Sequence, residues 1–265
     1  MSQPGGGVNG STRETVRGTV ERLRRHQKSN RGAPAYSRFV NRPLGRVIAA
    51  VAHRLGMTPN QVTAVSGFLS LCGILVAALL TPTVAAGVLV AVLLATGYAF
   101  DSADGQLARL RGGGSPAGEW LDHIVDCAKI TMLHLGVLAG LHRVGTASDA
   151  GVDPGVAGVA LPLAYLLVAN LFFFSFILTD QLKRQLAPAG PSTATGGVPE
   201  PASVLRSLLV VPTDYGLLCV AFLLWGWTVP FLVVYALLLL GTAGYLALGL
   251  PKWYRDIRDA APARG

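Results

Sequence analysis

Four aspartates stand close together in one apolar stretch of this chain: Asp101, Asp104, Asp122 and Asp126. A carboxylate inside a membrane costs roughly 3 kcal/mol, so four of them cost on the order of 10 kcal/mol unless cations or water compensate them. Oxygen ligands without His or Cys among them are typical of Mg²⁺ or Mn²⁺ sites, and two ions could be shared among the four acids. Such a pair would neutralise a diphosphate and align an attacking alcohol.

The first two acids share one helix face with two small residues. At 100° per residue this face covers an arc of about 100°, and it holds Asp101, Asp104, Gly105 and Ala108. The small residues allow a ligand or a neighbouring backbone to approach closely. Arg109 follows at the edge of the face, where its guanidinium can bind a phosphate oxygen.

The second pair of acids lies on one side of the next helix, because Gly118, Asp122 and Asp126 recur at intervals of four residues. Ser115 is predicted to cap this helix and Pro116 to begin it. The glycines just before Ser115 allow a tight turn. The two helices can therefore pack antiparallel, so that their acidic faces meet.

Together these residues form the string Asp101-x2-Asp104-Gly105-x2-Ala108-Arg109-x8-Gly118-x3-Asp122-x3-Asp126. The string resembles the signature of the CDP-alcohol phosphotransferases, also called CDP-alcohol phosphatidyltransferases, and every fixed position is filled. The resemblance implies a cytosol-facing cavity in which the first three aspartates bind metals. It also implies that Asp126 lies near both metal and acceptor and is the catalytic base. The CDP moiety would be held by Asp104, Gly105, Ala108, Arg109 and Gly118.

The same resemblance implies transfer of a substituted phosphate from a CDP-linked donor to an alcohol acceptor, with release of CMP, in phospholipid biosynthesis. We favour CDP-diacylglycerol as the donor, because this is the commonest arrangement in the bacterial members that the chain resembles. The alternative is a CDP-choline or CDP-ethanolamine reaction on diacylglycerol, since Asp122-His123-x2-Asp126 looks like that branch. There His123 would take the proton; otherwise it makes a polar contact within the bundle. Lys129 is a further candidate, either countering the carboxylates or forming a structural ion pair.

The acids must be positioned by helices that cross a membrane. A hydrophobic fraction of 51% with only 14% charged residues lies outside the usual range of soluble proteins. Apolar runs near 20 residues long occur at about 60–80, 84–110, 118–141, 155–179, 208–226 and 229–249. The chain is therefore predicted to be an all-α integral membrane protein with six transmembrane helices.

The distribution of Lys and Arg predicts the orientation. Eleven of them precede residue 60, others follow the second and fourth spans or lie in the tail, and the first and fifth connections hold none. Because basic segments stay in the cytoplasm, both termini and the active site are predicted to face it, in a multi-pass protein of the cell membrane. The net charge of +8 lies beside apolar tracts, which favours membrane lipids as partners and argues against nucleic acid.

Residues 36–55 combine apolar residues and arginines at helical spacing. This pattern predicts an amphipathic helix in the membrane interface, although a helix packed on protein would have the same periodicity. Residues 1–35 are predicted to be a basic, flexible tail, residues 36–250 the membrane domain and residues 251–265 a cytoplasmic tail. Small residues on the spans permit a homodimer.

Several other charged residues have two interpretations. Asp180, Lys183, Arg184 and Arg206 border the fourth connection, where the cations would bind a phosphate on the acceptor or only set the topology. Asp214 within the fifth span is either a functional residue or a helix cap. An ion-coupled transporter that uses the aspartates as a relay is the alternative from another class. It is disfavoured because the acids cluster at one membrane end.

Overall fold

The computed structural model describes residues 15–25, 34–146, 154–186 and 213–260, and the regular elements within these ranges are all helical. Five of these helices are long and apolar enough to cross a membrane. They are α3 (Pro59–Leu79), α4 (Val84–Leu110), α5 (Pro116–Thr146), α6 (Gly155–Leu186) and α9 (Thr228–Ala260). The prediction of an all-α, multi-pass membrane protein is therefore confirmed.

The predicted span 208–226 is only partly described. Its described part consists of α8 (Tyr215–Ala221) and the short 3-10 helix η3 (Phe222–Leu224). These elements cover roughly 15 Å at 1.5 Å per residue, about half of the apolar core of a bilayer. Residues 187–212, which include Arg206, lie outside the described residues. The structure thus supports five crossings, and the sixth stays a prediction.

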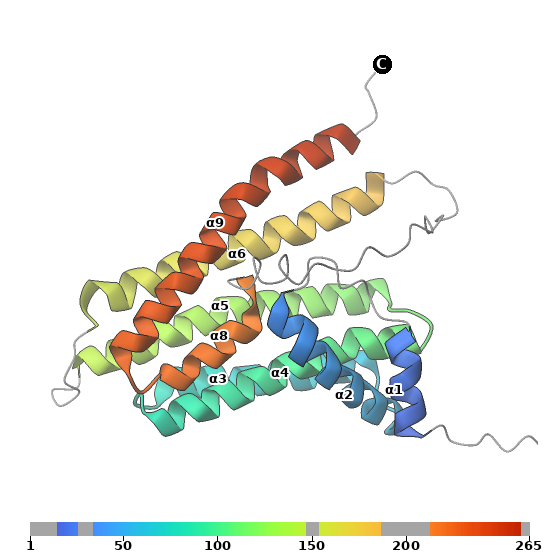
Figure 1. The fold of residues 1–265 in the computed structure, drawn as a ribbon, viewed down its shortest axis with the longest axis horizontal. Coiled ribbons are helices and arrows are strands. Elements are labelled where there is room, and N and C mark those ends of the chain that lie inside the picture. Colours follow the sequence, from blue (N-terminus) through green and yellow to red (C-terminus); the bar gives the residue numbers. More distant parts are fainter. Residues whose placement is uncertain (1–14, 26–33, 147–153, 187–212, 261–265) are drawn as a thin grey trace, which may run out of the picture.

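The acid-bearing ends of the helices lie at one end of the bundle. Figure 1 shows the α4–α5 turn, the C-terminal ends of α6 and α9, and the two N-terminal helices toward the right-hand side. Helix α9 continues through Pro251 to Ala260, so the predicted tail 251–265 is helical over most of its length. Because Lys183 pairs with Asp256 at 2.6 Å, this extension is held against α6.

The N-terminal region contains more structure than the predicted tail. Helix α1 (Val16–Arg25) lies within residues 1–35, and its Leu23 is buried in a cluster with Ala49 and Ala52. A π-helix, η1 (Ser37–Asn41), leads into α2 (Arg42–Arg54). The predicted tail therefore contains one helix, α1, which apolar contacts with α2 stabilise.

Helix α2 has one face packed on protein and one exposed face. Its inner face is made of small residues, and a Cβ on Gly45 would approach the Gln106 and Ser102 side chains of α4 to 2.8 Å. Its outer face exposes large apolar side chains, such as Leu44 at 50% and Val47 at 49%. One side of α2 therefore packs on protein, while the other is free to enter the acyl boundary of a membrane.

Helices α3 and α4 pack closely where the site begins. The Ser66 hydroxyl donates to the carbonyl oxygen of Gly97 at 2.9 Å, and Gly97 faces Ser70 without a side chain of its own. Helix α3 starts with a capping box in which Thr58 and Gln61 each accept from the other's backbone N–H. These contacts fix the position of α3 beside the acidic face of α4.

The α4–α5 turn has the predicted chemistry. Gly112 and Gly113 adopt φ angles of 96° and 125°, a region that side chains disfavour. The Ser115 hydroxyl accepts from the Gly118 N–H at 3.0 Å, and α5 begins at Pro116. The predicted cap and start of this helix are confirmed.

Asp214 links α8 to the N-terminal segment. Its carboxylate caps α8 by accepting from the Gly216 N–H at 3.0 Å, and it also accepts from the Ser37 N–H at 3.1 Å. Of the two interpretations, the helix cap is confirmed. Through this residue the position of η1 depends on α8.

Candidate functional site

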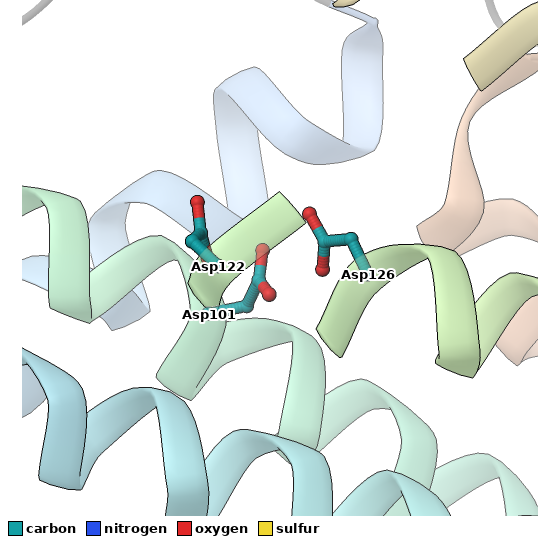
Figure 2. A group of neighbouring side chains, drawn as sticks. All are labelled: Asp101, Asp122 and Asp126. Carbon is teal, nitrogen blue, oxygen red and sulfur yellow. The ribbon is translucent and has the colours of Figure 1, made fainter. Parts of the chain in front are cut away.

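Three of the predicted acids meet between α4 and α5. Figure 2 shows Asp101 of α4 and Asp122 and Asp126 of α5 directed into a common space. One carboxylate oxygen of each lies within 4.8 Å of the other two. The antiparallel packing across the glycine turn therefore brings the two acidic faces together.

A lysine completes this cluster. Lys129, with only 8% of its side chain exposed, forms ion pairs with Asp101 and, at 2.9 Å, with Asp126. Its ammonium also donates to the Ser66 hydroxyl of α3 at 3.0 Å. The positive charge of Lys129 offsets part of the acidic charge. Its contacts with α3, α4 and α5 hold the carboxylates of Asp101 and Asp126 in place. We call Asp101, Asp122, Asp126 and Lys129 the acid–lysine cluster.

Asp104 stands apart from this cluster. One of its oxygens accepts from the Thr63 hydroxyl of α3 at 2.6 Å, and the other accepts from the N–H of Gly105. Asp104 follows Asp101 by three positions, which turns its side chain by about 60° toward α3. The sequence predicted that all four carboxylates converge, whereas three do so in the structure.

The donor set fits a hard divalent cation. All three converging ligands are carboxylates, which suits Mg²⁺ or Mn²⁺. Asp122 Oδ1 is buried and has no hydrogen-bond partner among the described residues. A buried acceptor without a donor is rare in folded proteins, and a bound cation would satisfy it.

A large cavity of about 570 Å³ opens beside the cluster, between α3, α4, α5 and α6. The residues predicted to hold CDP all line it, namely Asp104, Gly105, Ala108, Arg109 and Gly118. Asn60 and Thr63 contribute from α3, and a Cβ on Gly118 would lie 3.1 Å from Asn60 Oδ1. Position 118 therefore has little room for a side chain.

A small cavity of about 290 Å³ lies next to the large one, where α4 meets η1 and the start of α2. Its lining is mostly polar and includes Ser37, Asn41, Arg42, Ser102 and Gln106. Four residues line both cavities: Asp104, Gly105, Arg109 and Asp122. The two cavities thus meet at the acids.

The rim of the large cavity is formed by charged residues that pair with one another. Arg184 of α6 forms ion pairs with Glu119 at 2.8 Å and with Asp180 at 2.6 Å. His123 Nε2 lies 3.8 Å from Glu119 Oε1, and its ring meets Phe173 edge to face. His123 therefore belongs to the rim and not to the acid–lysine cluster.

Sequence reasoning missed several residues of the site. Thr63, Ser66 and Ser70 recur on α3 at intervals of three and four, and this polar stripe in an apolar span could have been found. Asn41 and Gln106 gave no comparable signal, because their proximity depends on how α2 docks on α4. Both line the small cavity.

A family model described as CDP-alcohol phosphatidyltransferase matches residues 56–246. No curated protein matches the chain. Among solved structures, phosphatidylinositol phosphate synthase from Mycobacterium tuberculosis with CDP-DAG bound is 23% identical, with a TM-score of 0.50. The match covers 81% of this chain and 94% of that one. At this identity the likeness shows a shared fold.

Proposed function

The chain belongs to the CDP-alcohol phosphatidyltransferase family, and from this premise we propose that it transfers a phosphatidyl group from CDP-diacylglycerol to a small alcohol. Family membership makes the chain a phosphotransferase, which sets aside the ion-coupled transporter. The observation that carries the proposal is the group of three converging carboxylates, of which Asp101 lines the small cavity and Asp122 lines both cavities.

The size of the large cavity supports a nucleotide as its occupant. At about 30 Å³ per water-sized group, its 570 Å³ hold roughly twenty non-hydrogen atoms, the size of a nucleoside monophosphate. Arg109 would bind a phosphate oxygen there. The M. tuberculosis synthase, which shares the fold, was solved with CDP-DAG bound, and this favours the same donor for this chain.

The proposed reaction is one displacement at phosphorus. The acceptor oxygen forms a bond to the phosphorus that carries the diacylglycerol, and the bond from this phosphorus to the bridging oxygen breaks. CMP leaves with that oxygen and its electron pair, while the acceptor proton passes to a base. The products are a phosphatidyl alcohol and CMP, without a covalent enzyme intermediate.

Asp101, Asp122 and Asp126, with Asp104 beside them, would hold Mg²⁺ or Mn²⁺, which would stabilise charge on the phosphates. We assign the base to Asp126. Its carboxylate belongs to the cluster and is oriented by Lys129, whereas His123 is directed to Glu119 and Phe173 on the rim. In this proposal Lys129 is a positioning residue.

The topology follows from the same proposal. We infer six crossings with both termini in the cytoplasm, since α8 and η3 need residues before Tyr215 to complete a span. The catalytic domain would comprise residues 36–250, with the acids facing the cytoplasm and the outer face of α2 in the inner leaflet. The homodimer stays a prediction.

Purified protein in detergent provides the test. CDP-diacylglycerol, Mn²⁺ or Mg²⁺ and a panel of alcohols would be supplied, and CMP measured. We expect CMP release that depends on both an alcohol and a metal. Release only from CDP-choline or CDP-ethanolamine with diacylglycerol would replace the proposal by the alternative branch, and absence of release from every donor would refute it.

A further inference from the structure

Lys129 uses its whole hydrogen-bonding capacity inside the acid–lysine cluster. An ammonium has three hydrogens to donate, and Nζ donates them to Asp101, to Asp126 at 2.9 Å and to the Ser66 hydroxyl at 3.0 Å. Ser66 in turn donates to the Gly97 carbonyl oxygen at 2.9 Å. Groups from α3, α4 and α5 therefore satisfy the ammonium completely and fix its position.

The lysine is placed too deeply in the bundle to move its charge into water. It follows the start of α5 at Pro116 by 13 residues, which puts it roughly 20 Å along the helix. Its side chain is only 8% exposed, and it lines neither the large nor the small cavity. Since a buried ammonium that leaves its carboxylates is strongly destabilising, we expect Lys129 to keep its position when the site binds metal.

The ammonium stands where a second metal ion would bind. The two ions of a two-metal site lie about 3.5 to 4 Å apart, so they would have to share the three carboxylates of this cluster, whose oxygens lie within 4.8 Å of one another. Lys129 already contacts one oxygen each of Asp101 and Asp126. An ion bound to the same two oxygens would touch the ammonium, and the like charges would repel each other.

The remaining acid of the cluster is not paired with the lysine. Among the described residues, Lys129 forms ion pairs with Asp101 and Asp126 but not with Asp122. Asp122 lines both cavities, and its Oδ1 has no hydrogen-bond partner among the described residues. The cluster thus has one side filled by an ammonium and one side suited to a cation.

The charge of the cluster agrees with this division. Three carboxylates and one ammonium carry two net negative charges, which one divalent ion neutralises. A second divalent ion would make the cluster positive within an apolar bundle, where uncompensated charge is costly.

We propose that the acid–lysine cluster binds one divalent ion and not two, and that the Lys129 ammonium takes the place of the second. The three carboxylates hold the ion, and the ammonium stays between Asp101 and Asp126. The proposal rests on the proposed function, because it assumes the metal site named there, and it deepens that function by giving the number of ions. It replaces the expectation of two ions shared among the acids.

Mn²⁺ titration of the full-length protein in detergent tests this number. Electron paramagnetic resonance measures free Mn²⁺, so the ions removed from solution give the number bound per chain. We expect one tightly bound ion in wild type and two in Lys129→Met, whose side chain has a similar length and no charge. The two ions in this variant should show spin coupling, because ions that share carboxylates lie about 4 Å apart.

Lys252→Met is the matched control, since Lys252 is exposed on α9 and lines neither cavity. This variant should bind one ion, as wild type does. Circular dichroism and thermal unfolding report whether Lys129→Met is folded. Lys129→Gln, which keeps a polar group but not the charge, gives a second variant with the same expected number of two ions.

The outcomes separate the two proposals. If the wild-type protein neither binds Mn²⁺ nor releases CMP from CDP-diacylglycerol, the proposed function fails. If wild type binds two spin-coupled ions per chain, only the assignment of one ion is overturned. That assignment is also overturned if folded Lys129→Met and Lys129→Gln each bind a single ion, because the ammonium is then not what excludes the second.

Discussion

Helix α5 contributes to two buried polar groups that differ in almost every other respect. One is the acid–lysine cluster, and the other is an aromatic group formed by His134, Tyr165, Tyr235 and Thr242. In the aromatic group, His134 Nδ1 shares a hydrogen bond of 2.5 Å with the Tyr235 hydroxyl. His134 also stacks on Tyr165 with ring centroids 4.4 Å apart. None of its four members lines the large or the small cavity.

The difference between the two groups shows how a reactive site can be told from buried polar residues that only stabilise the fold. Burial and polar character are common to both groups, and His134 at 2% exposure is more buried than Lys129. The aromatic group leaves none of its buried side-chain N or O atoms without a hydrogen-bond partner, as a stable core requires. The acid–lysine cluster combines several like charges with an unpaired oxygen on Asp122 beside two cavities. In this protein, the functional region is therefore the place where a buried polar atom lacks a hydrogen-bond partner and lies beside a cavity.

The largest effect is expected from Asp126→Asn. If Asp126 is the base, its loss should lower the rate of CMP release about 10³-fold, within the usual range for general-base catalysis. Thermal stability should change little, because the amide has the same shape and Lys129 keeps its ion pair with Asp101. Asp259→Asn is the matched control, since Asp259 is exposed and pairs only locally with Arg258. Equal activity of the two variants would rule out Asp126 as the base.

Lys129→Met should have the next largest effect. Removal of the cation leaves Asp101 and Asp126 facing each other, which should destabilise the metal-free protein by about 3 kcal/mol, as when a buried ion pair is broken. Activity should fall about tenfold or more through misplacement of Asp126. Mn²⁺ should bind more tightly and restore more thermal stability than in wild type, because repulsion by the ammonium is gone. Weaker Mn²⁺ binding would contradict this role.

His134→Phe should have the opposite pattern of effects, lowering stability without lowering activity. The ring can still stack on Tyr165, but the buried Tyr235 hydroxyl loses its partner, at a cost of about 1 to 3 kcal/mol of stability. Activity per folded molecule should match that of wild type. Chemical denaturation and CMP release on the same preparation measure both quantities. A loss of activity without a loss of stability would show that the aromatic group takes part in the reaction.

Asp214→Ala should give the smallest effect. Loss of the α8 cap should cost about 1 kcal/mol. Because Asp214 also accepts from the Ser37 N–H, the variant should loosen η1, and the Ser37 amide should exchange its hydrogen faster than in wild type. For Asp214→Asn, which keeps an acceptor oxygen, the stability and the exchange rate should lie between those of wild type and Asp214→Ala. An unchanged exchange rate of the Ser37 amide would show that η1 keeps its position without this link.

The sequence allowed the helices and most of the acidic site to be predicted. Apolar length located five spans closely, and the Ser115 cap and the meeting of the α4 and α5 acids followed from local chemistry and periodicity. Periodicity assigns a residue to a helix face but does not identify which neighbour that face meets. The turning of Asp104 toward Thr63 was therefore not predicted. The small cavity was missed for the same reason, since it depends on the docking of α2.

Mn²⁺ binding to the purified protein, followed by electron paramagnetic resonance, tests the central claim that the three carboxylates hold a divalent cation. We predict that wild-type protein and His134→Phe remove free Mn²⁺ with equal affinity, that Mg²⁺ competes for the same site, and that Asp101→Asn and Asp122→Asn each weaken binding about tenfold or more. Equal Mn²⁺ affinity in wild type and in both aspartate variants would contradict the account.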